Sequence, residues 1–130
     1  MTAQQAQLAS VMDWLEYSGR RLGLDSQLLL RLQLVAEELF LNTVQHGHPR
    51  DPDIELGLSA GNGEVLLTYA DHGPAFDPGR HAKCPDPEHD GIGLMLIRQL
   101  PDRMDYRRQD GQNLISLRFT ACAQGRISTP

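Results

Sequence analysis

Residues 34–47 constrain the fold most, because they form a strongly helical, apolar run that carries one polar stripe. Glu38, Asn42 and His46 follow one another at intervals of four, and side chains four apart are neighbours on a helix surface. A carboxylate beside a carboxamide on an otherwise apolar helix disfavours a core and favours a functional site. A stripe that simply faces water is the alternative, since most amphipathic helices have one.

Two helices are predicted in the first third of the chain. Hydrophobic residues at helical spacing indicate a helix over about residues 3–22, with Gly23 as its C-terminal stop. Asp25 or Ser26 then caps a second helix, which runs to about His46. A connection this short predicts that the two helices lie antiparallel.

The hydrophobic period changes from that of a helix to that of a strand after the second helix. Four strands are predicted, at residues 53–59, 64–70, 103–109 and 112–120. Residues 61–63, Gly-Asn-Gly, form the turn of the first pair, and Asp110-Gly111 forms the turn of the second. Each pair of strands is therefore expected to be a β-hairpin.

Between the two pairs of strands lies a long stretch with few apolar residues. A connection of this length without regular structure is typical of a lid over a site, and we place the lid at about residues 78–91. Residues 94–100 form a third predicted helix, and residues 121–130 are expected to fray. Three helices on one face of a mixed, mostly antiparallel sheet of four or five strands predict a two-layer α+β sandwich, with residues 1–130 as one domain.

Composition narrows the class of protein. The net charge is −5 and no basic run is present, which argues against binding to nucleic acid. Cys84 and Cys122 form no C-x-x-C pattern, which fits a reducing cytoplasm. The N-terminus lacks the pattern of a signal peptide, and the apolar runs are too short to span a membrane. We therefore expect a cytoplasmic protein that binds neither nucleic acid nor membrane.

Two further spots carry residues that packing does not require. Asp71-x-Gly73 follows a predicted central strand, and Gly91-x-Gly93 opens an apolar helix. A helix N-terminus offers unpaired N–H groups that suit phosphate, and glycines let a ligand approach the backbone closely. Taken singly, each spot has an alternative explanation: an Asx turn at Asp71, and a tight loop at Gly91 and Gly93. Together with the helical stripe, in this order, they favour a site.

On these residues the chain resembles the histidine-kinase-like ATPases, the superfamily shared by gyrase, mismatch-repair and heat-shock chaperone ATPases and sensor kinases. Within it, the pattern is similar to that of the anti-sigma factor serine/threonine kinases. The matching motifs lie at residues 36–46, 71–78 and 91–97, and the resemblance spans about residues 10–119. It implies the Bergerat ATP-binding fold.

The resemblance also implies a role for each matched residue. Glu38 is the expected catalytic base, Asn42 the expected Mg²⁺ ligand, and Asp71 the acceptor of the adenine amino group. The other implied ATP contacts are His46, Gly73, Phe76, Gly91, Ile92, Gly93 and Leu94. For His46, a cap at the end of the helix is an equal alternative.

The implied function is that of an ATP-binding regulator in a partner-switching system. Such a regulator is expected to phosphorylate an anti-anti-sigma factor on serine or threonine and to sequester a sigma factor. The alternative is a nucleotide-dependent binding module with little turnover, but Glu38 favours the kinase because a binder needs no base.

Members of the family usually begin with a strand before the first helix, whereas the first predicted helix here starts at about residue 3. The sheet is therefore expected to lack an edge strand, which leaves the formation of a homodimer open. A metal site at His81, Cys84 and His89 is disfavoured by their irregular spacing.

Overall fold

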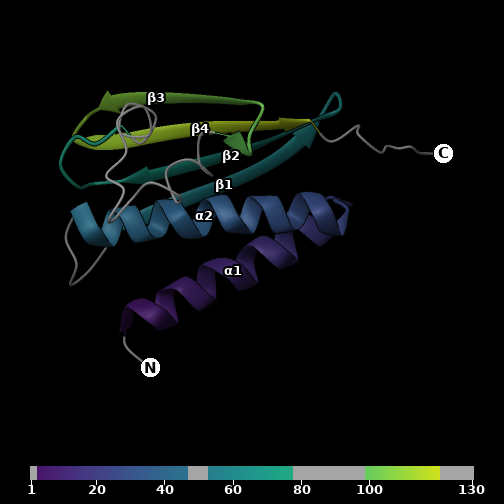
Figure 1. The fold of residues 1–130 in the computed structure, drawn as a ribbon, viewed down its shortest axis with the longest axis horizontal. Coiled ribbons are helices and arrows are strands. Elements are labelled where there is room, and N and C mark those ends of the chain that lie inside the picture. Colours follow the sequence, from purple (N-terminus) through teal and green to yellow (C-terminus); the bar gives the residue numbers. More distant parts are fainter. Residues whose placement is uncertain (1–2, 47–52, 78–98, 121–130) are drawn as a thin grey trace.

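A computed structural model of the chain describes residues 3–46, 53–77 and 99–120, which form two helices and a four-stranded sheet (Figure 1). The elements are α1 (Ala3–Arg21), α2 (Ser26–His46), β1 (Ile54–Gly61), β2 (Glu64–Asp71), β3 (Arg103–Gln109) and β4 (Gln112–Thr120). Both helices lie on one side of the sheet and run in opposite directions (Figure 1). The expected two-layer α+β sandwich is confirmed.

The connection between α1 and α2 follows from local signals in the sequence. Gly23 has a positive φ of 78°, and the Leu24 N–H donates to the Gly19 carbonyl over 3.0 Å, the bond of a Schellman motif. Asp25 then accepts the Leu28 N–H at its Oδ1 over 2.8 Å and caps α2. The predicted stop is confirmed, and Asp25 is the cap of the two candidates.

The sheet has the strand order β1-β2-β4-β3, and every pairing in it is antiparallel. Asn62 and Gly63 join β1 to β2 with φ values of 55° and 76°. Asp110 and Gly111 join β3 to β4 with φ values of 53° and 76°. Two consecutive positive φ values define the tight turn that best matches the twist of a hairpin. Both predicted hairpins are confirmed.

The core lies between the helices and the two central strands, β2 and β4. Alternate residues of these strands point towards the helices, as a period of two requires. The buried hydrophobic residues of the core cluster are Val11, Leu15, Leu28, Leu32, Val35, Ala36, Leu39, Val65, Leu67, Tyr69, Ile115, Leu117 and Phe119. The same alternation turns Asp71 and Asn113 inward, and these two residues are direct partners in the ladder. The apolar core therefore ends on a buried polar pair.

Some predicted features cannot be compared with the structure. The lid at residues 78–91, nearly all of the third helix and the tail at residues 121–130 lie outside the described residues. The candidate positions Gly91, Ile92, Gly93, Leu94, His81, Cys84 and His89 lie outside them as well. Neither described helix combines the length and the hydropathy that crossing a membrane requires.

Candidate functional site

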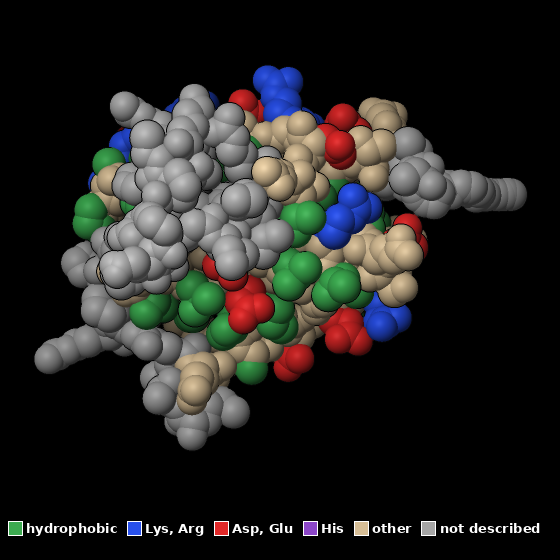
Figure 2. Space-filling model, viewed as in Figure 1, with side chains coloured by type: hydrophobic (Ala, Val, Ile, Leu, Met, Phe, Trp, Pro, Cys, Tyr) green, Lys and Arg blue, Asp and Glu red, His purple; other side chains and the backbone are tan. Residues whose placement is uncertain are grey.

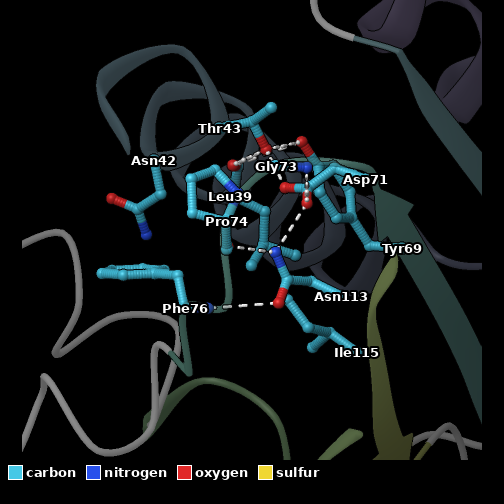
Figure 3. Close-up of a pocket in the computed structure, with 10 residues that line it drawn as sticks. All are labelled: Leu39, Asn42, Thr43, Tyr69, Asp71, Gly73, Pro74, Phe76, Asn113 and Ile115. Carbon is cyan, nitrogen blue, oxygen red and sulfur yellow. Dashed lines mark hydrogen bonds between the residues drawn. The ribbon is translucent and has the colours of Figure 1, made fainter. Parts of the chain in front are cut away.

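A pocket opens where the apolar core ends, between the C-terminal half of α2, the end of β2 and the start of β4 (Figure 3). It holds about 320 Å³ of space, its open mouth included. The lining residues are Leu39, Asn42, Thr43, Tyr69, Asp71, Gly73, Pro74, Phe76, Asn113 and Ile115. The structure thus brings together Asn42, Asp71, Gly73 and Phe76, which were predicted from two separate stretches of sequence.

Asp71 is the only buried acidic residue among those described, with 8% of its surface exposed. Its Oδ1 accepts the Gly73 N–H over 3.1 Å and the Asn113 side-chain amide over 2.8 Å. Its Oδ2 accepts the Thr43 hydroxyl over 2.8 Å. The bond to Gly73 is that of an Asx turn. The Asx-turn interpretation is therefore right, and the same carboxylate also lines the pocket.

Thr43 receives a hydrogen bond in turn from Tyr69, whose hydroxyl lies 2.5 Å from the Thr43 Oγ1. Burial raises the pKa of Tyr69 well above its ordinary value, the hydrogen bond with Thr43 opposes this, and the charge of Asp71 adds to it. The phenol therefore keeps its proton. Tyr69 is the donor to Thr43 because Thr43 gives its only proton to Asp71 Oδ2. The Leu39 carbonyl lies 3.2 Å from the Tyr69 hydroxyl and 3.1 Å from Thr43 Oγ1.

Asn113 uses all of its side-chain hydrogen-bonding capacity. Its Nδ2 donates to Asp71 and to the Pro74 carbonyl, each over 2.8 Å. Its Oδ1 accepts the Tyr106 hydroxyl over 2.6 Å and the Phe76 N–H over 3.1 Å. Because the donors and acceptors on the two sides differ, only one orientation of the amide satisfies all four bonds. Asn113 thereby joins β4, β3 and the segment after β2.

The segment after β2 is held by β3 and β4 at further points. Arg108 of β3 donates from Nη1 to the Gly73 carbonyl over 2.7 Å. His72 lies 3.0 Å from the Gln112 side-chain amide through Nε2, and 3.4 Å from the Asp53 carboxylate through Nδ1. These contacts hold the segment that follows β2 against the sheet. This wall of the pocket is therefore already formed before any ligand binds.

Asn42 contributes the other polar group that matters in the pocket. It is 8% exposed, and its buried Nδ2 has no hydrogen-bond partner within the part of the chain that the structure describes. Figure 3 shows its side chain in the pocket, on the same side as Phe76. A buried amide without a partner costs about 1–3 kcal/mol, which a ligand could recover. The interpretation of the stripe as a water-facing one is therefore wrong for Asn42.

The remaining predicted residues are not gathered in this pocket by the described structure. Glu38 lies one helical turn before Asn42 on α2, where it is half-buried and does not line the pocket. His46 is the last residue of α2, and its side chain lies outside the description. The loop residues Gly91, Ile92, Gly93 and Leu94 lie outside it too. The phosphate side of the site therefore stays a prediction.

Thr43, Tyr69 and Asn113 belong to the site, but the sequence did not point to them as site residues. Thr43 is a buried residue of α2, and Tyr69 is a buried residue of β2. A clue lay in the strand pattern, because Asn113 occupies an inward position in line with Ile115 and other apolar residues. A polar residue at a core position needs a partner, and here the partner is Asp71.

The sequence matches a known protein family over most of its length. The family described as the histidine kinase-like ATPase domain matches residues 1–119. The serine/threonine-protein kinase BtrW of Bordetella bronchiseptica is 35% identical, over 80% of this chain and 79% of that protein.

Solved structures show the same fold at lower identity. The catalytic domain of the histidine kinase ThkA is 13% identical with a TM-score of 0.58, over 90% of this chain and 92% of that one. AdeS of Acinetobacter baumannii is 15% identical with a TM-score of 0.57, over 72% of this chain and 47% of that one. The blue-light activated histidine kinase EL346 of Erythrobacter litoralis is 19% identical with a TM-score of 0.58, over 78% of this chain and 33% of that one. This chain spans less than half of the last two proteins, and these likenesses concern the fold alone.

Proposed function

Because the chain belongs to the histidine kinase-like ATPase domain family, we propose that it binds ATP in the pocket beside α2 and transfers the γ-phosphoryl group to a protein. The acceptor is a serine or threonine hydroxyl. The similarity to a serine/threonine-protein kinase supports this choice of acceptor. The observation that carries the proposal is the buried Asp71 carboxylate at the pocket wall.

Asp71 selects the base of the nucleotide. A carboxylate accepts hydrogen bonds and donates none, so it favours the 6-amino group of adenine. Guanine carries an acceptor oxygen at the same position, which the carboxylate repels. A hydrogen bond to a charged group contributes about 1.5–3 kcal/mol, or roughly 10- to 150-fold in affinity. This one contact is sufficient to make the pocket specific for ATP.

Asn42 fits the role of the Mg²⁺ ligand. Its side chain is buried in the pocket, where the amide nitrogen, unpartnered among the described residues, suits an acceptor such as a phosphate oxygen and the other end of the carboxamide suits a cation. The carboxamide oxygen is a suitable donor for a hard cation, which takes its other ligands from nucleotide phosphates and water. When bound, Mg²⁺ neutralises charge on the phosphates.

Glu38 acts as the base. The carboxylate takes the proton of the acceptor hydroxyl while the hydroxyl oxygen bonds to the γ-phosphorus. The bond from the γ-phosphorus to the bridging oxygen breaks, and ADP leaves. Leu34 and Leu41, which are 36% and 42% exposed, lie four residues before and three after Glu38 on α2. A protein acceptor therefore finds apolar surface beside the base.

The partner we propose is an anti-anti-sigma factor-like protein in a partner-switching system, with a sigma factor as a second partner. The protein works in the cytoplasm in this proposal. The second candidate is a binding module in which nucleotide only sets the shape of the partner surface. Glu38 separates the two, because a module without turnover has no use for a base.

Phosphotransfer tests the proposal. Purified protein is mixed with Mg²⁺, γ-labelled ATP and a purified anti-anti-sigma factor-like protein, and label on the acceptor is measured. We expect Glu38→Ala to lower the labelling rate at least about 100-fold, because general bases contribute 10²–10⁴-fold. Its ATP affinity should stay within a few-fold of wild type.

The neighbouring Glu37→Ala is the matched control. It removes the same charge from the same helix, between the same two leucines, and should label at nearly the wild-type rate. If wild type binds ATP but never labels the acceptor, the kinase is excluded and the binding module remains. Equal losses in both variants would mean that Glu38 acts through surface charge, not as a base.

A further inference from the structure

The Asp71 carboxylate has one acceptor site left after its described partners are counted. A carboxylate offers about four lone-pair sites, two on each oxygen. Oδ1 accepts from Gly73 and Asn113, and Oδ2 accepts from Thr43. One site on Oδ2 therefore remains in a pocket that this carboxylate lines.

Thr43 Oγ1 lies within hydrogen-bond distance of three oxygens, those of Tyr69, Leu39 and Asp71. The bond with Tyr69 takes its proton from the phenol if Thr43 gives its own proton to Asp71. Thr43 has one proton of its own, and both the Leu39 carbonyl and Asp71 Oδ2 lie within reach, at 3.1 Å and 2.8 Å. The bond to the carboxylate is the shorter and is charge-assisted, so it is preferred. A directed chain runs from Tyr69 through Thr43 to Asp71.

Asn113 fixes the other oxygen. It is 3% exposed, and its four hydrogen bonds leave its amide no freedom to rotate or flip. The amide proton that it gives to Oδ1 cannot be withdrawn without breaking the bonds to Phe76 and Pro74. The carboxylate is thus clamped at both oxygens by side chains from two different elements, α2 and β4.

We propose that Thr43 and Asn113 are positioning residues for base recognition, which hold Asp71 so that a single acceptor site on Oδ2 meets a 6-amino group. This inference rests on the proposed binding of ATP in this pocket. Without either clamp the carboxylate can rotate, and its contact with the amino group weakens. The rest of the base and the phosphates do not depend on the clamps. Loss of a clamp therefore lowers discrimination between bases more than it lowers binding of an unsubstituted purine.

The test compares ATP with purine riboside 5′-triphosphate, which lacks only the 6-amino group, by calorimetry with Mg²⁺. Thr43→Val keeps the shape of the side chain but removes the hydroxyl, and Thr43→Ser keeps the hydroxyl. We expect wild type to prefer ATP by about 10-fold or more, the gain from one charge-assisted bond. Thr43→Val should reduce this preference to about 3-fold or less, and Thr43→Ser should restore it.

Asn113→Ala provides an independent arm and should also reduce the preference, because Oδ1 loses its side-chain donor. If both nucleotides weaken by the same factor in Thr43→Val, the residue serves only the fold and the inference is overturned. An unchanged preference for ATP in Thr43→Val overturns the inference as well. If Asn113→Ala does not fold, the comparison of Thr43→Val with Thr43→Ser is sufficient to test it. A wild-type protein that binds neither nucleotide defeats the proposed function itself, whereas a wild-type preference that survives in the variants defeats this inference alone.

Discussion

At the scale of single residues, the pocket is built around one buried negative charge. Burying a carboxylate is unfavourable unless hydrogen bonds compensate for the lost water. Here the compensation comes from three places: the hydroxyl of Thr43, the amide of Asn113 and the backbone of Gly73. The arrangement gives the buried carboxylate hydrogen-bond donors without using up its acceptor capacity.

Tyr69 gives this network a measurable pH dependence. Its raised pKa means that the folded protein keeps the phenol proton where the unfolded chain releases it. The stabilisation is complete below about pH 10, the pKa in the unfolded chain, and is lost as the pH rises above that value. From pH 10 to pH 11 the free energy of unfolding should fall by about 1 kcal/mol on this account.

Urea unfolding at pH 9, 10 and 11 measures this loss. Tyr69→Phe should remove it, so that the variant loses about 1 kcal/mol less than wild type between pH 10 and 11. Tyr17→Phe, which changes an exposed tyrosine, is the control and should follow wild type. Parallel curves for Tyr69→Phe and wild type would show that Tyr69 ionises in the folded protein as it does in the unfolded chain.

The sequence identified the site residues that belong to local motifs, but not the residues that support them. Asn42 belongs to one short motif, and Asp71 and Gly73 belong to another, so each can be recognised from its neighbours in the sequence. Thr43 and Asn113 reach Asp71 from 28 and 42 residues away. The strand pattern marks Asn113 as an inward polar residue but does not identify its partner, because the contacts exist only once β2 pairs with β4 and α2 packs on the sheet. Only the structure therefore identifies these long-range hydrogen-bonded pairs.

At the scale of elements, boundaries were predictable wherever a local signal sets them. Gly23 ends α1, and the two glycine-containing turns set the register of both hairpins. The pairing of β2 with β4 was not predicted, because it joins strands that are far apart in the sequence and have similar alternation. That pairing brings Asp71 opposite Asn113, so the site depends on the part of the topology that the sequence pattern leaves open.

The start of α2 offers a direct test at this scale. Asp25 caps the helix through Leu28, and removing an N-cap costs about 1 kcal/mol, with a range of 0.5–2 kcal/mol. Asp25→Ala should lower the free energy of unfolding by that amount in urea. Asp13→Ala, in an exposed position within α1, removes the same charge without a cap and should cost less. A smaller effect at residue 25 than at residue 13 would contradict the capping role.

At the scale of the whole molecule, the pocket and the surface beside it meet on α2. The inner face of this helix supplies Asn42 and Thr43 to the pocket. Its outer face carries Leu30, Leu34 and Leu41 exposed to solvent. On the face shown in Figure 2, hydrophobic side chains surround acidic ones. One helix is therefore placed to connect nucleotide in the pocket with a partner on the surface, as the proposed function requires.

Calorimetric titration of the purified protein with ATP and with GTP, each with Mg²⁺, measures whether Asp71 makes the pocket selective for adenine. We expect ATP to bind and GTP to bind at least about 10-fold more weakly, because Asp71 accepts from an amino group and repels an oxygen. Asp71→Asn should weaken ATP binding, whereas Asp110→Asn, which removes the same charge at a turn that tolerates asparagine, should not. Failure to bind ATP, or equal binding of ATP and GTP, would contradict the recognition of adenine by Asp71.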